Sequence, residues 1–200
     1  VEKFILNEKE NPSDLIEVHN RPNYLSDIVN SLGKKNLVLY FHNDPLTMSG
    51  SKSITERKNL LKICYKIIFN SNWSKKRFLE GMQNKFVNSE KLLVVFQSAK
   101  KINIIPKNKR KEITFVGKLN KSKGYDIFGK AVLKILKKYP DWKVNVSGDE
   151  QRDKIEFNHK NLRNYGFIPH KKVIDIYKRT SIAVVCSRWE EPFGRTSLEA

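Results

Sequence analysis

The sequence predicts an α/β protein made of two doubly wound parallel sheets, each covered by helices. Short apolar runs of strand length alternate with segments of helical period along the whole chain. A hydrophilic stretch with four basic residues in five positions, 107–111, interrupts this alternation near the middle. We therefore expect two domains, 1–106 and 112–200, joined by a linker at 107–111. Each is small for an α/β domain, so we expect both sheets to be incomplete.

Strand and helix signals alternate in the first half. Polar and turn-forming residues bound the apolar runs, and the segments between them repeat apolar residues every three or four positions. We expect strands at 14–18, 36–41, 66–70 and 92–96, with helices at 24–32, 53–63 and 74–82. Because helices separate the strands, the strands are expected to run parallel.

The second half repeats this pattern. The spacing of Phe128, Val132, Ile135 and Leu136 indicates an amphipathic helix. We expect strands at 113–116, 143–147, 162–165 and 182–186, with further helices at 173–178 and after Gly194. The sequence thus predicts a second parallel sheet covered by helices.

Composition narrows the class of protein. The 200 residues are 39% hydrophobic and 30% charged, an ordinary balance for a globular chain. The longest apolar runs, such as 37–41 and 92–96, are far shorter than the ~20 residues that span a membrane. Residues 1–10 are charged and do not read as a secretory signal, so we expect a cytoplasmic protein. Cys64 and Cys186 lack zinc-site or disulfide spacing, and we expect buried thiols.

The chain carries a large positive charge. Lys and Arg number 39 against 21 Asp and Glu, a formal net charge of +18. This charge favours polyanionic partners: nucleic acid, an anionic membrane, or phosphorylated small molecules. Lysine is abundant throughout, a bias that genome composition can also produce. Aromatic residues are not interleaved with the basic ones and no zinc finger is present, so we expect no nucleic-acid partner and keep nucleic acid only as a minor alternative.

Polar residues follow the strands of the first half. Ligands of open α/β sheets bind beyond the carboxyl ends of the strands. The first expected strand is followed by His19, and the second is followed by His42, Asn43 and Asp44. We therefore expect these four side chains at one rim of the first sheet.

The loop 117–124 follows the first strand of the second half and opens a helix. Free backbone N–H groups and the helix dipole favour anions at such a place, and Lys118 and Lys123 add positive charge. The loop lacks the Gly-x-x-x-x-Gly-Lys-Ser/Thr pattern of an ATPase phosphate loop. The alternative interpretation is a solvated loop in a lysine-rich protein.

The segment 191–200 contains a turn followed by a helix start. Pro192 and Gly194 mark the turn, and exposed N–H groups just after it can bind a phosphate. Glu191 and Glu199 stand eight positions apart and can accept hydrogen bonds from a polyhydroxyl ligand. The alternative is a capped surface helix with stabilising acidic residues.

These segments resemble the family-four retaining glycosyltransferases, which have the GT-B fold of two Rossmann-like domains. Residues 116–119 and 123–124 match one part of the family pattern, and 187–200 match its E-x7-E signature through Glu191 and Glu199. The resemblance is close from Ile113 onward. It covers the upstream half more loosely, through the two histidine segments and residues 67–71.

The resemblance implies a role for each matching residue. Lys118 and Lys123 would bind the donor diphosphate. Most members of the family carry arginine where Lys118 stands, and lysine keeps the positive charge but cannot form the two parallel hydrogen bonds of an arginine. Glu191 would hold hydroxyls of the donor sugar, and Glu199 would accept from the ribose. The implied donor-binding residues are Gly117, Lys118, Lys123, Gly148, Phe167, Ile168, Glu191, Phe193, Gly194, Arg195, Thr196 and Glu199. The implied catalytic residues are His42, Lys123 and Glu191, with His19, Asn43 and Asp44 on the acceptor side.

The resemblance also implies a reaction. A hexose would pass from a nucleoside diphosphate sugar to an acceptor hydroxyl with retained anomeric configuration, in bacterial surface polysaccharide or glycolipid synthesis. No metal or other cofactor is expected, because cationic side chains stabilise the departing diphosphate, and no Asp-x-Asp triplet occurs in the sequence. The expected partners are a nucleotide sugar, a saccharide or lipid-linked acceptor, and an anionic membrane surface on the inner face of the plasma membrane.

Two other functions remain open. A nucleotide-sugar epimerase would share the fold and the diphosphate site, and acceptor-dependent turnover separates it from a transferase. A basic binding module for nucleic acid or membrane would rest on the charge of +18 alone. Its binding would fall steeply with salt and would not respond to nucleotide sugars.

Overall fold

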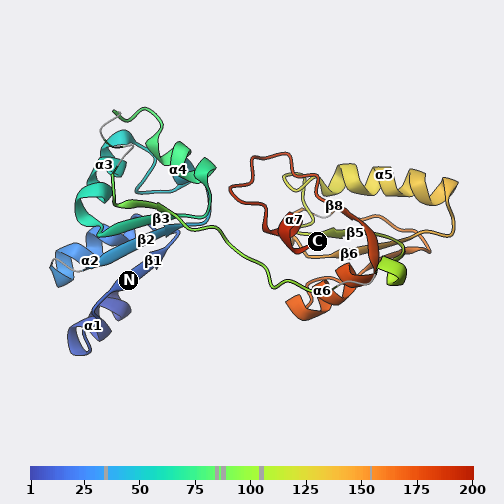
Figure 1. Ribbon diagram of the computed structural model, residues 1–200, viewed down its shortest axis with the longest axis horizontal. Coiled ribbons are helices and arrows are strands. Elements are labelled where there is room, and N and C mark those ends of the chain that lie inside the picture. The colour runs from blue at the N-terminus through green and yellow to red at the C-terminus, as the bar shows by residue number, and fades with distance from the viewer. Residues whose placement is uncertain (34–35, 84–85, 87–88, 104–105, 154) are drawn as a thin grey trace. The chain divides into compact units, whose positions relative to one another are not determined.

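The computed structural model describes residues 1–200 except 34–35, 84–85, 87–88, 104–105 and 154 (Figure 1). The chain folds into two compact units, Val1–Gln97 and Ser98–Ala200. Each unit contains a four-stranded sheet in which all neighbouring strands are parallel. The predicted class, two parallel sheets covered by helices, is therefore confirmed.

The first unit has the strand order β1-β2-β3-β4. Its strands are β1 (Ile16–His19), β2 (Leu37–Phe41), β3 (Lys66–Phe69) and β4 (Leu92–Val94). Its helices are α1 (Glu2–Glu10), α2 (Tyr24–Leu32), α3 (Ile54–Ile63) and α4 (Asn72–Leu79), with a short 3-10 helix at Pro45–Thr47. The sequence therefore runs strand, helix, strand through the unit, which is the connection that parallel strands require.

The core of the first unit lies between the sheet and its helices. Phe41, Phe69 and Phe78 pack with ring centroids 5.3 to 5.8 Å apart, and all three are fully buried. Leu39 and Ile67 on the two central strands are also fully buried. Burial of each such side chain contributes roughly 1.5–3 kcal/mol, so the apolar runs in the sequence become the central strands.

The second unit has the strand order β7-β6-β5-β8. Its strands are β5 (Arg110–Val116), β6 (Lys143–Ser147), β7 (Leu162–Asn164) and β8 (Thr180–Val184). Its helices are α5 (Tyr125–Lys138), α6 (His170–Arg179) and α7 (Arg195–Glu199), with a 3-10 turn at Pro106–Asn108. Figure 1 shows α5 and α6 on opposite faces of the sheet. The chain leaves β5 toward β6 and β7 and later returns to its other side as β8, which makes a topological switch point beside β5.

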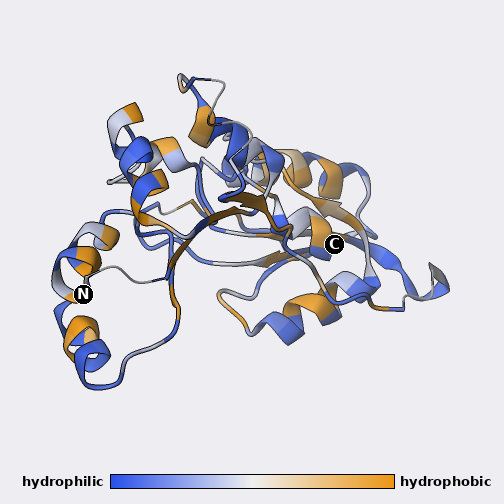
Figure 2. Cartoon of the chain, turned by 60° about the vertical axis from the view of Figure 1, so that its left-hand side comes forward, coloured by the Kyte–Doolittle hydropathy of each residue, from blue (hydrophilic) through white to orange (hydrophobic). Residues whose placement is uncertain are grey.

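Helix α5 buries the stripe that its sequence predicts. Phe128, Val132 and Leu136 are at most 2% exposed and pack with Phe115 and Val146 of the sheet. In Figure 2 the central strands are hydrophobic, whereas the helices show hydrophobic and hydrophilic residues on different sides. No helix in the described part of the chain is long and apolar enough to cross a membrane.

The division between the units differs from the expected linker at 107–111. The structure divides the chain between Gln97 and Ser98, and β5 already includes Arg110 and Lys111. The basic run begins a strand because its long side chains reach solvent: Arg110 and Lys111 are exposed, and Lys111 pairs with Asp141 at 2.5 Å. The expected boundaries 1–106 and 112–200 are corrected accordingly.

Helix α1 was not expected from the sequence. Most of its residues are charged or polar, so its apolar pattern is weak, although Ile5 is buried. Glu8 is also buried and accepts hydrogen bonds from Ser13, at 2.6 Å from its hydroxyl. Of the two cysteines that we expected to be buried thiols, only Cys64 is fully buried. Cys64 is 1% exposed, and burial raises its pKa to about 12, while Cys186 is half-buried.

Candidate functional site

A pocket of about 500 Å³ opens in the second unit at the carboxyl ends of β5 and β6. The start of α6 and helix α7 complete its wall. It brings together eight of the residues expected to bind a donor: Gly117, Lys118, Gly148, Phe167, Ile168, Arg195, Thr196 and Glu199. This is the end of a parallel sheet, beside its switch point, where ligands of such folds bind.

Glycines let the strand ends pack backbone to backbone beneath this pocket. A Cβ on Gly148 would lie 1.8 Å from the carbonyl oxygen of Gly117, and the φ of Gly148 is +137°. The Gly117 N–H donates to the Ser147 carbonyl at 3.0 Å, and the Gly148 N–H donates to Gly166 at 2.9 Å. Only glycine fits this close approach, so the loop positions depend on Gly148.

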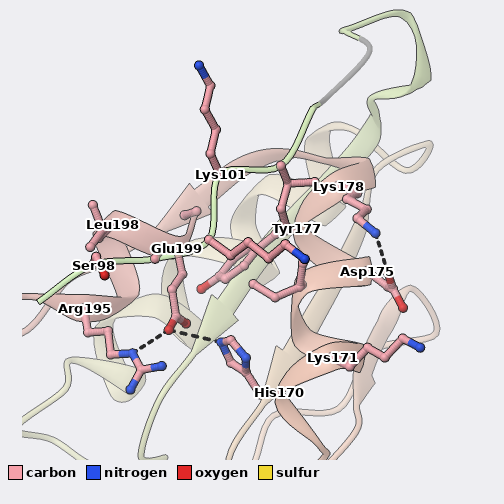
Figure 3. A pocket seen from close by; sticks show the side chains of 15 residues that line it. Ser98, Lys101, His170, Lys171, Asp175, Tyr177, Lys178, Arg195, Leu198 and Glu199 are labelled. Carbon is pink, nitrogen blue, oxygen red and sulfur yellow. Dashed lines mark hydrogen bonds and ion pairs between the residues drawn. The ribbon is translucent and has the colours of Figure 1, made fainter.

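The carboxylate of Glu199 is held by two neighbours. Its Oε1 accepts from Arg195 Nε at 2.6 Å and lies 3.1 Å from His170 Nε2 (Figure 3). The Glu199 side chain is only 10% exposed. Within the described residues no donor bonds to its second oxygen, Oε2, which therefore remains able to accept from a ligand.

His170 also lines a second hollow, of about 560 Å³, which Arg195 and Glu199 line as well (Figure 3). The sequence places His170 beside Lys171 and Lys172, in hydrophilic surroundings that are typical of a solvent-facing side chain. The side chain is 59% exposed, yet it contacts Glu199 and lines the donor-side pocket. His170 is the first residue of α6 and directly follows the loop 166–169.

Lys123 and Glu191 form an ion pair with each other. Neither residue lines the pocket of about 500 Å³ described above. Lys123 Nζ lies 2.5 Å from Glu191 Oε1, and the two side chains are 24% and 21% exposed. The Ser187 hydroxyl donates to the same carboxylate oxygen. Lys123 also lies over the Trp189 ring, 5.0 Å from its centroid.

The environment of Glu191 favours its charged form. Burial raises the pKa of this carboxyl, but hydrogen bonds from Lys123 and Ser187 outweigh burial and hold the pKa below its ordinary value. The pair is enclosed by a close contact nearby: a Cβ on Gly124 would lie 2.0 Å from the Cys186 carbonyl oxygen. The loops after β5 and β8 are thus packed against each other.

Phe193 and Gly194 lie in the turn before α7. Gly194 has φ +78°, and its carbonyl accepts from the Ser197 N–H at 3.0 Å. Phe193 is half-buried and, unlike Arg195 and Thr196, is not among the residues lining the pocket.

The first unit brings the two expected histidines together. β1 and β2 are neighbours, and His19 Nδ1 lies 2.8 Å from His42 Nε2. Asn20, at φ +53°, accepts from the His42 N–H at 2.8 Å and from the Asn43 N–H at 3.3 Å. Asparagine is one of the few residues that adopts this left-handed conformation readily. Burial, and then the neighbouring His19, lower the pKa of His42.

Asp44 has a different environment from its neighbours at this rim. It is 8% exposed, accepts from the Leu46 N–H at 3.0 Å and forms an ion pair with Arg77 at 3.1 Å. These contacts cap the 3-10 helix that follows and tie it to α4. Asn43, in contrast, is exposed.

Two contacts of His42 at this rim were not predicted from the sequence. The ring of Tyr40 lies 4.4 Å from that of His42, and Gln97 contacts His42 as well.

Two Rossmann-like parallel sheets with a ligand pocket at a strand switch point define a protein of the GT-B class. Residues 97–200, about half of the chain, match the family model of glycosyl transferases group 1. The chain therefore belongs to the glycosyl transferases group 1 family.

Individual proteins of known sequence or structure agree with this assignment. Spore coat protein SA of Bacillus subtilis (strain 168) is 29% identical over 104 residues, which cover 46% of this chain and 28% of that protein. Anabaena HepE, solved in complex with UDP-glucose, superposes with a TM-score of 0.71 at 18% identity. The match covers 100% of this chain and 59% of HepE, so the present chain spans a little over half of that protein.

The pneumococcal O-GlcNAc transferase GtfA, solved in complex with UDP and GlcNAc, is a further structural neighbour. Its TM-score is 0.69 at 19% identity, and the match covers 99% of this chain and 42% of GtfA. At these identities the superpositions establish the fold.

Proposed function

We propose that the protein transfers a hexose from a nucleoside diphosphate sugar to an acceptor hydroxyl with retention of anomeric configuration. The observation that carries the proposal is the pocket of about 500 Å³ in which the glycine loops, Lys118, Arg195 and Glu199 converge. A cationic wall suits a diphosphate, and a carboxylate with a free oxygen suits ribose hydroxyls. The family membership of the chain supports the same reaction class.

We assign each part of the donor to different residues of the pocket. We assign the diphosphate to Lys118 and Arg195, the ribose to Glu199, and the base to the exposed loop carrying Phe167 and Ile168. Phe167 is 82% exposed, which leaves its face available for stacking on a base. UDP is the first nucleotide to test, because HepE was solved with UDP-glucose and GtfA with UDP.

The Lys123–Glu191 ion pair provides the reacting end of the donor site. In our proposal Lys123 turns toward the diphosphate as the glycosidic bond breaks, and Glu191 binds hydroxyls of the transferred sugar. Both groups are partly exposed, so the exchange requires no unfolding. Positive side chains around the departing diphosphate would stabilise its charge directly, so we propose a reaction that needs no metal ion.

The histidine rim of the first unit is proposed as the acceptor side. His19 and Asn43 are exposed there, and His42 lies just behind them. Imidazole and amide groups suit hydroxyls of a saccharide or of a lipid-linked sugar. Synthesis of a bacterial surface polysaccharide or glycolipid is the proposed setting.

The donor assignment is tested by a thermal-shift screen of the full-length protein against UDP-, GDP- and ADP-glucose. A ligand at 100 times its Kd stabilises the native state by about 2.7 kcal/mol, and we expect the UDP sugar to raise Tm. Glu190→Ala, which changes an exposed carboxylate nearby, should respond like the wild type, whereas Glu199→Ala should respond less. Equal responses of the wild type and Glu199→Ala would contradict the assignment. Turnover of the donor without an acceptor, with the sugar epimerised, would instead indicate the epimerase.

A group of basic residues in the second unit supports a second proposal, attachment to the inner face of an anionic membrane. A hollow of about 530 Å³, which we call the basic edge, is lined by Asn103, Lys107, Asn108, Lys109, Arg110, Lys178 and Arg179. It lies at the start of β5 and the end of α6, at the opposite ends of these elements from the donor pocket. Lys107 and Arg110 are exposed and form no ion pair with any described residue. Such cations suit lipid phosphates, each contributing ~1 kcal/mol near the surface.

A further inference from the structure

The imidazoles of His19 and His42 meet edge to edge. His19 Nδ1 and His42 Nε2 are 2.8 Å apart, while the ring centroids are 5.1 Å apart and the planes differ by 9°. A nitrogen pair this close, with centroids this far apart, requires the two ring edges to face each other. One nitrogen therefore donates a proton in the plane of the other ring, the preferred geometry for an sp² acceptor.

Gln97 decides which nitrogen donates. Its side-chain Nε2 lies 3.1 Å from His42 Nδ1, and an amide nitrogen can only donate. His42 Nδ1 must then accept, so the His42 proton sits on Nε2 and points at His19 Nδ1. His19 Nδ1 must accept in turn, which places the His19 proton on its own Nε2.

We propose that Gln97, His42 and His19 form a directed chain of hydrogen bonds that presents the His19 Nε2–H to the acceptor hydroxyl. His42 is then a positioning residue, since both of its ring nitrogens are engaged inside the chain. The His19 side chain is 52% exposed, and its Nε2 lies 3.5 Å from Glu17 Oε1. The contact with an acceptor rests on the proposed transferase function, whereas the hydrogen-bond direction does not.

The groups around the chain hold it in one orientation. Tyr40 lies parallel to His42 at a centroid distance of 4.4 Å, and its hydroxyl donates to the Val95 carbonyl at 2.8 Å. The neutral Asn70 donates to the His42 carbonyl at 2.8 Å. Burial, and then Glu17, raise the pKa of Tyr40, so its phenol keeps its proton. Among the described residues that contact the histidine pair, Glu17 supplies the negative charge. The nearby Arg21 guanidinium donates to the Asn20 carbonyl at 2.9 Å.

This arrangement resists protonation. Each acceptor nitrogen of the pair already receives a hydrogen bond, so an added proton must break a contact with Gln97 or the contact between the histidines. Burial and the neighbouring His19 lower the pKa of His42 in agreement. The pair therefore donates a hydrogen bond to the acceptor oxygen and does not remove its proton. That proton must pass to another base, such as an oxygen of the departing diphosphate.

Imidazole ¹⁵N–¹H NMR of the full-length protein tests the direction of the chain. Histidine variants assign each signal, and two-bond correlations show which ring nitrogen carries the proton. We expect both His19 and His42 as Nε2–H tautomers at pH 7. A proton on Nδ1 of either histidine, or a charged pair at that pH, would overturn the proposal.

Gln97→Glu makes the same test by charge. A carboxylate accepts rather than donates, so the His42 proton should move to Nδ1 and the His42 titration should shift upward by about 1–3 pH units. Gln83→Glu introduces the same charge at an exposed position of the same unit and should leave the tautomers unchanged. Unchanged His42 signals in Gln97→Glu would show that Gln97 does not set the tautomer.

His19→Asn separates the acceptor contact from the hydrogen-bond chain. The Asn amide oxygen can replace Nδ1 as acceptor from His42, but the variant lacks the Nε2–H. NMR should therefore show an unchanged His42 tautomer, while KM for the acceptor rises roughly 3- to 10-fold and KM for the donor stays constant. An unchanged acceptor KM would contradict the contact. So would an acid limb in kcat/KM that disappears in His19→Asn, because it would show that the pair takes a proton. If no transfer is found at all, the two NMR experiments still test the direction of the hydrogen bonds among Gln97, His42 and His19.

Discussion

Lys123 Nζ lies 2.5 Å from Glu191 Oε1, joining the loop after β5 to the segment that follows β8. The two residues are 68 positions apart in the sequence and meet because β5 and β8 are neighbours. In this structure each neutralises the other. In the proposed reaction both change partners, Lys123 to the diphosphate and Glu191 to the sugar.

Lys123→Ala should lower kcat as well as donor affinity. Charge grows on the diphosphate as the glycosidic bond breaks, so removal of a cation there weakens the transition state more than the ground state. We expect a loss in kcat/KM of roughly 2–4 kcal/mol, by analogy with the removal of one oxyanion stabiliser. Steady-state kinetics with Lys130→Ala, an exposed lysine on α5, as the control measure this. A change in KM alone would place Lys123 away from the reacting bond.

Glu199→Ala should act mainly on KM for the donor. The ribose does not change during the reaction, so its hydrogen bonds contribute equally to the ground and transition states. The expected loss is about 1.5–3 kcal/mol, the range for hydrogen bonds to a charged group. A 2′,3′-dideoxy nucleotide should bind the wild type poorly and bind Glu199→Ala as well as the natural nucleotide does. If the variant still discriminates as strongly as the wild type, Glu199 is not the ribose ligand.

Gly148→Ala should destabilise the second unit. The new Cβ would meet the Gly117 carbonyl at 1.8 Å at a φ of +137°, so the two loops must separate. We expect a loss of roughly 1–3 kcal/mol or more in the free energy of unfolding, together with weaker nucleotide binding. The control is Gly166→Ala, where φ is +64° and no atom lies within 4 Å of the new Cβ. That variant should lose only the ~1–2 kcal/mol of a left-handed non-glycine residue.

Acid should remove the contribution of the Lys123–Glu191 pair to stability. The folded-state pKa of Glu191 lies below its ordinary value of 4.5, so the pair stabilises the native state above pH 4.5. The contribution is lost as the pH falls through the lower, folded-state value. Urea unfolding from pH 7 to pH 3 should show the wild type and Glu191→Gln converging below pH 4.5. A difference that stays constant over the whole range would contradict the lowered pKa.

Charge reversal at the basic edge should weaken membrane attachment. The variant Lys107→Glu/Arg110→Glu should bind phosphatidylglycerol vesicles less tightly than the wild type, and raised salt should weaken wild-type binding because exposed charges are screened over ~8–10 Å. Lys130→Glu/Lys134→Glu makes the same charge change on exposed positions of α5 and serves as the control. Vesicle flotation with phosphatidylcholine as the neutral lipid measures both effects. Equal binding to the two lipids would exclude the membrane proposal.

Local patterns predicted the secondary structure well. The bounds of α2 (Tyr24–Leu32) and β6 (Lys143–Ser147) agree with the expected ranges, because period and flanking turn residues define both. The sequence does not predict helix α1, because only a small part of the helix is buried and its apolar pattern is therefore weak. The start of β5 was placed too late because charged residues at a strand end resemble a linker.

The site was predictable only in part. Rules for strand ends, together with the resemblance, located Gly117, Gly148 and Glu199 at one pocket, which the structure shows. The partners of these residues depend on tertiary neighbours far away in sequence. The His170 contact with Glu199 and the Gln97 contact with His42 span 29 and 55 positions, so no local pattern reveals them.

Hydrogen exchange of the full-length protein with and without the nucleotide sugar tests the donor pocket most directly. Bound ligand slows exchange where it contacts or orders the backbone. We predict protection in peptides covering 117–124, 147–149, 166–168 and 194–199 when UDP-glucose is added, with weaker protection in Glu199→Ala. Protection confined to other segments, under conditions where the ligand is bound, would contradict the placement of the donor in this pocket.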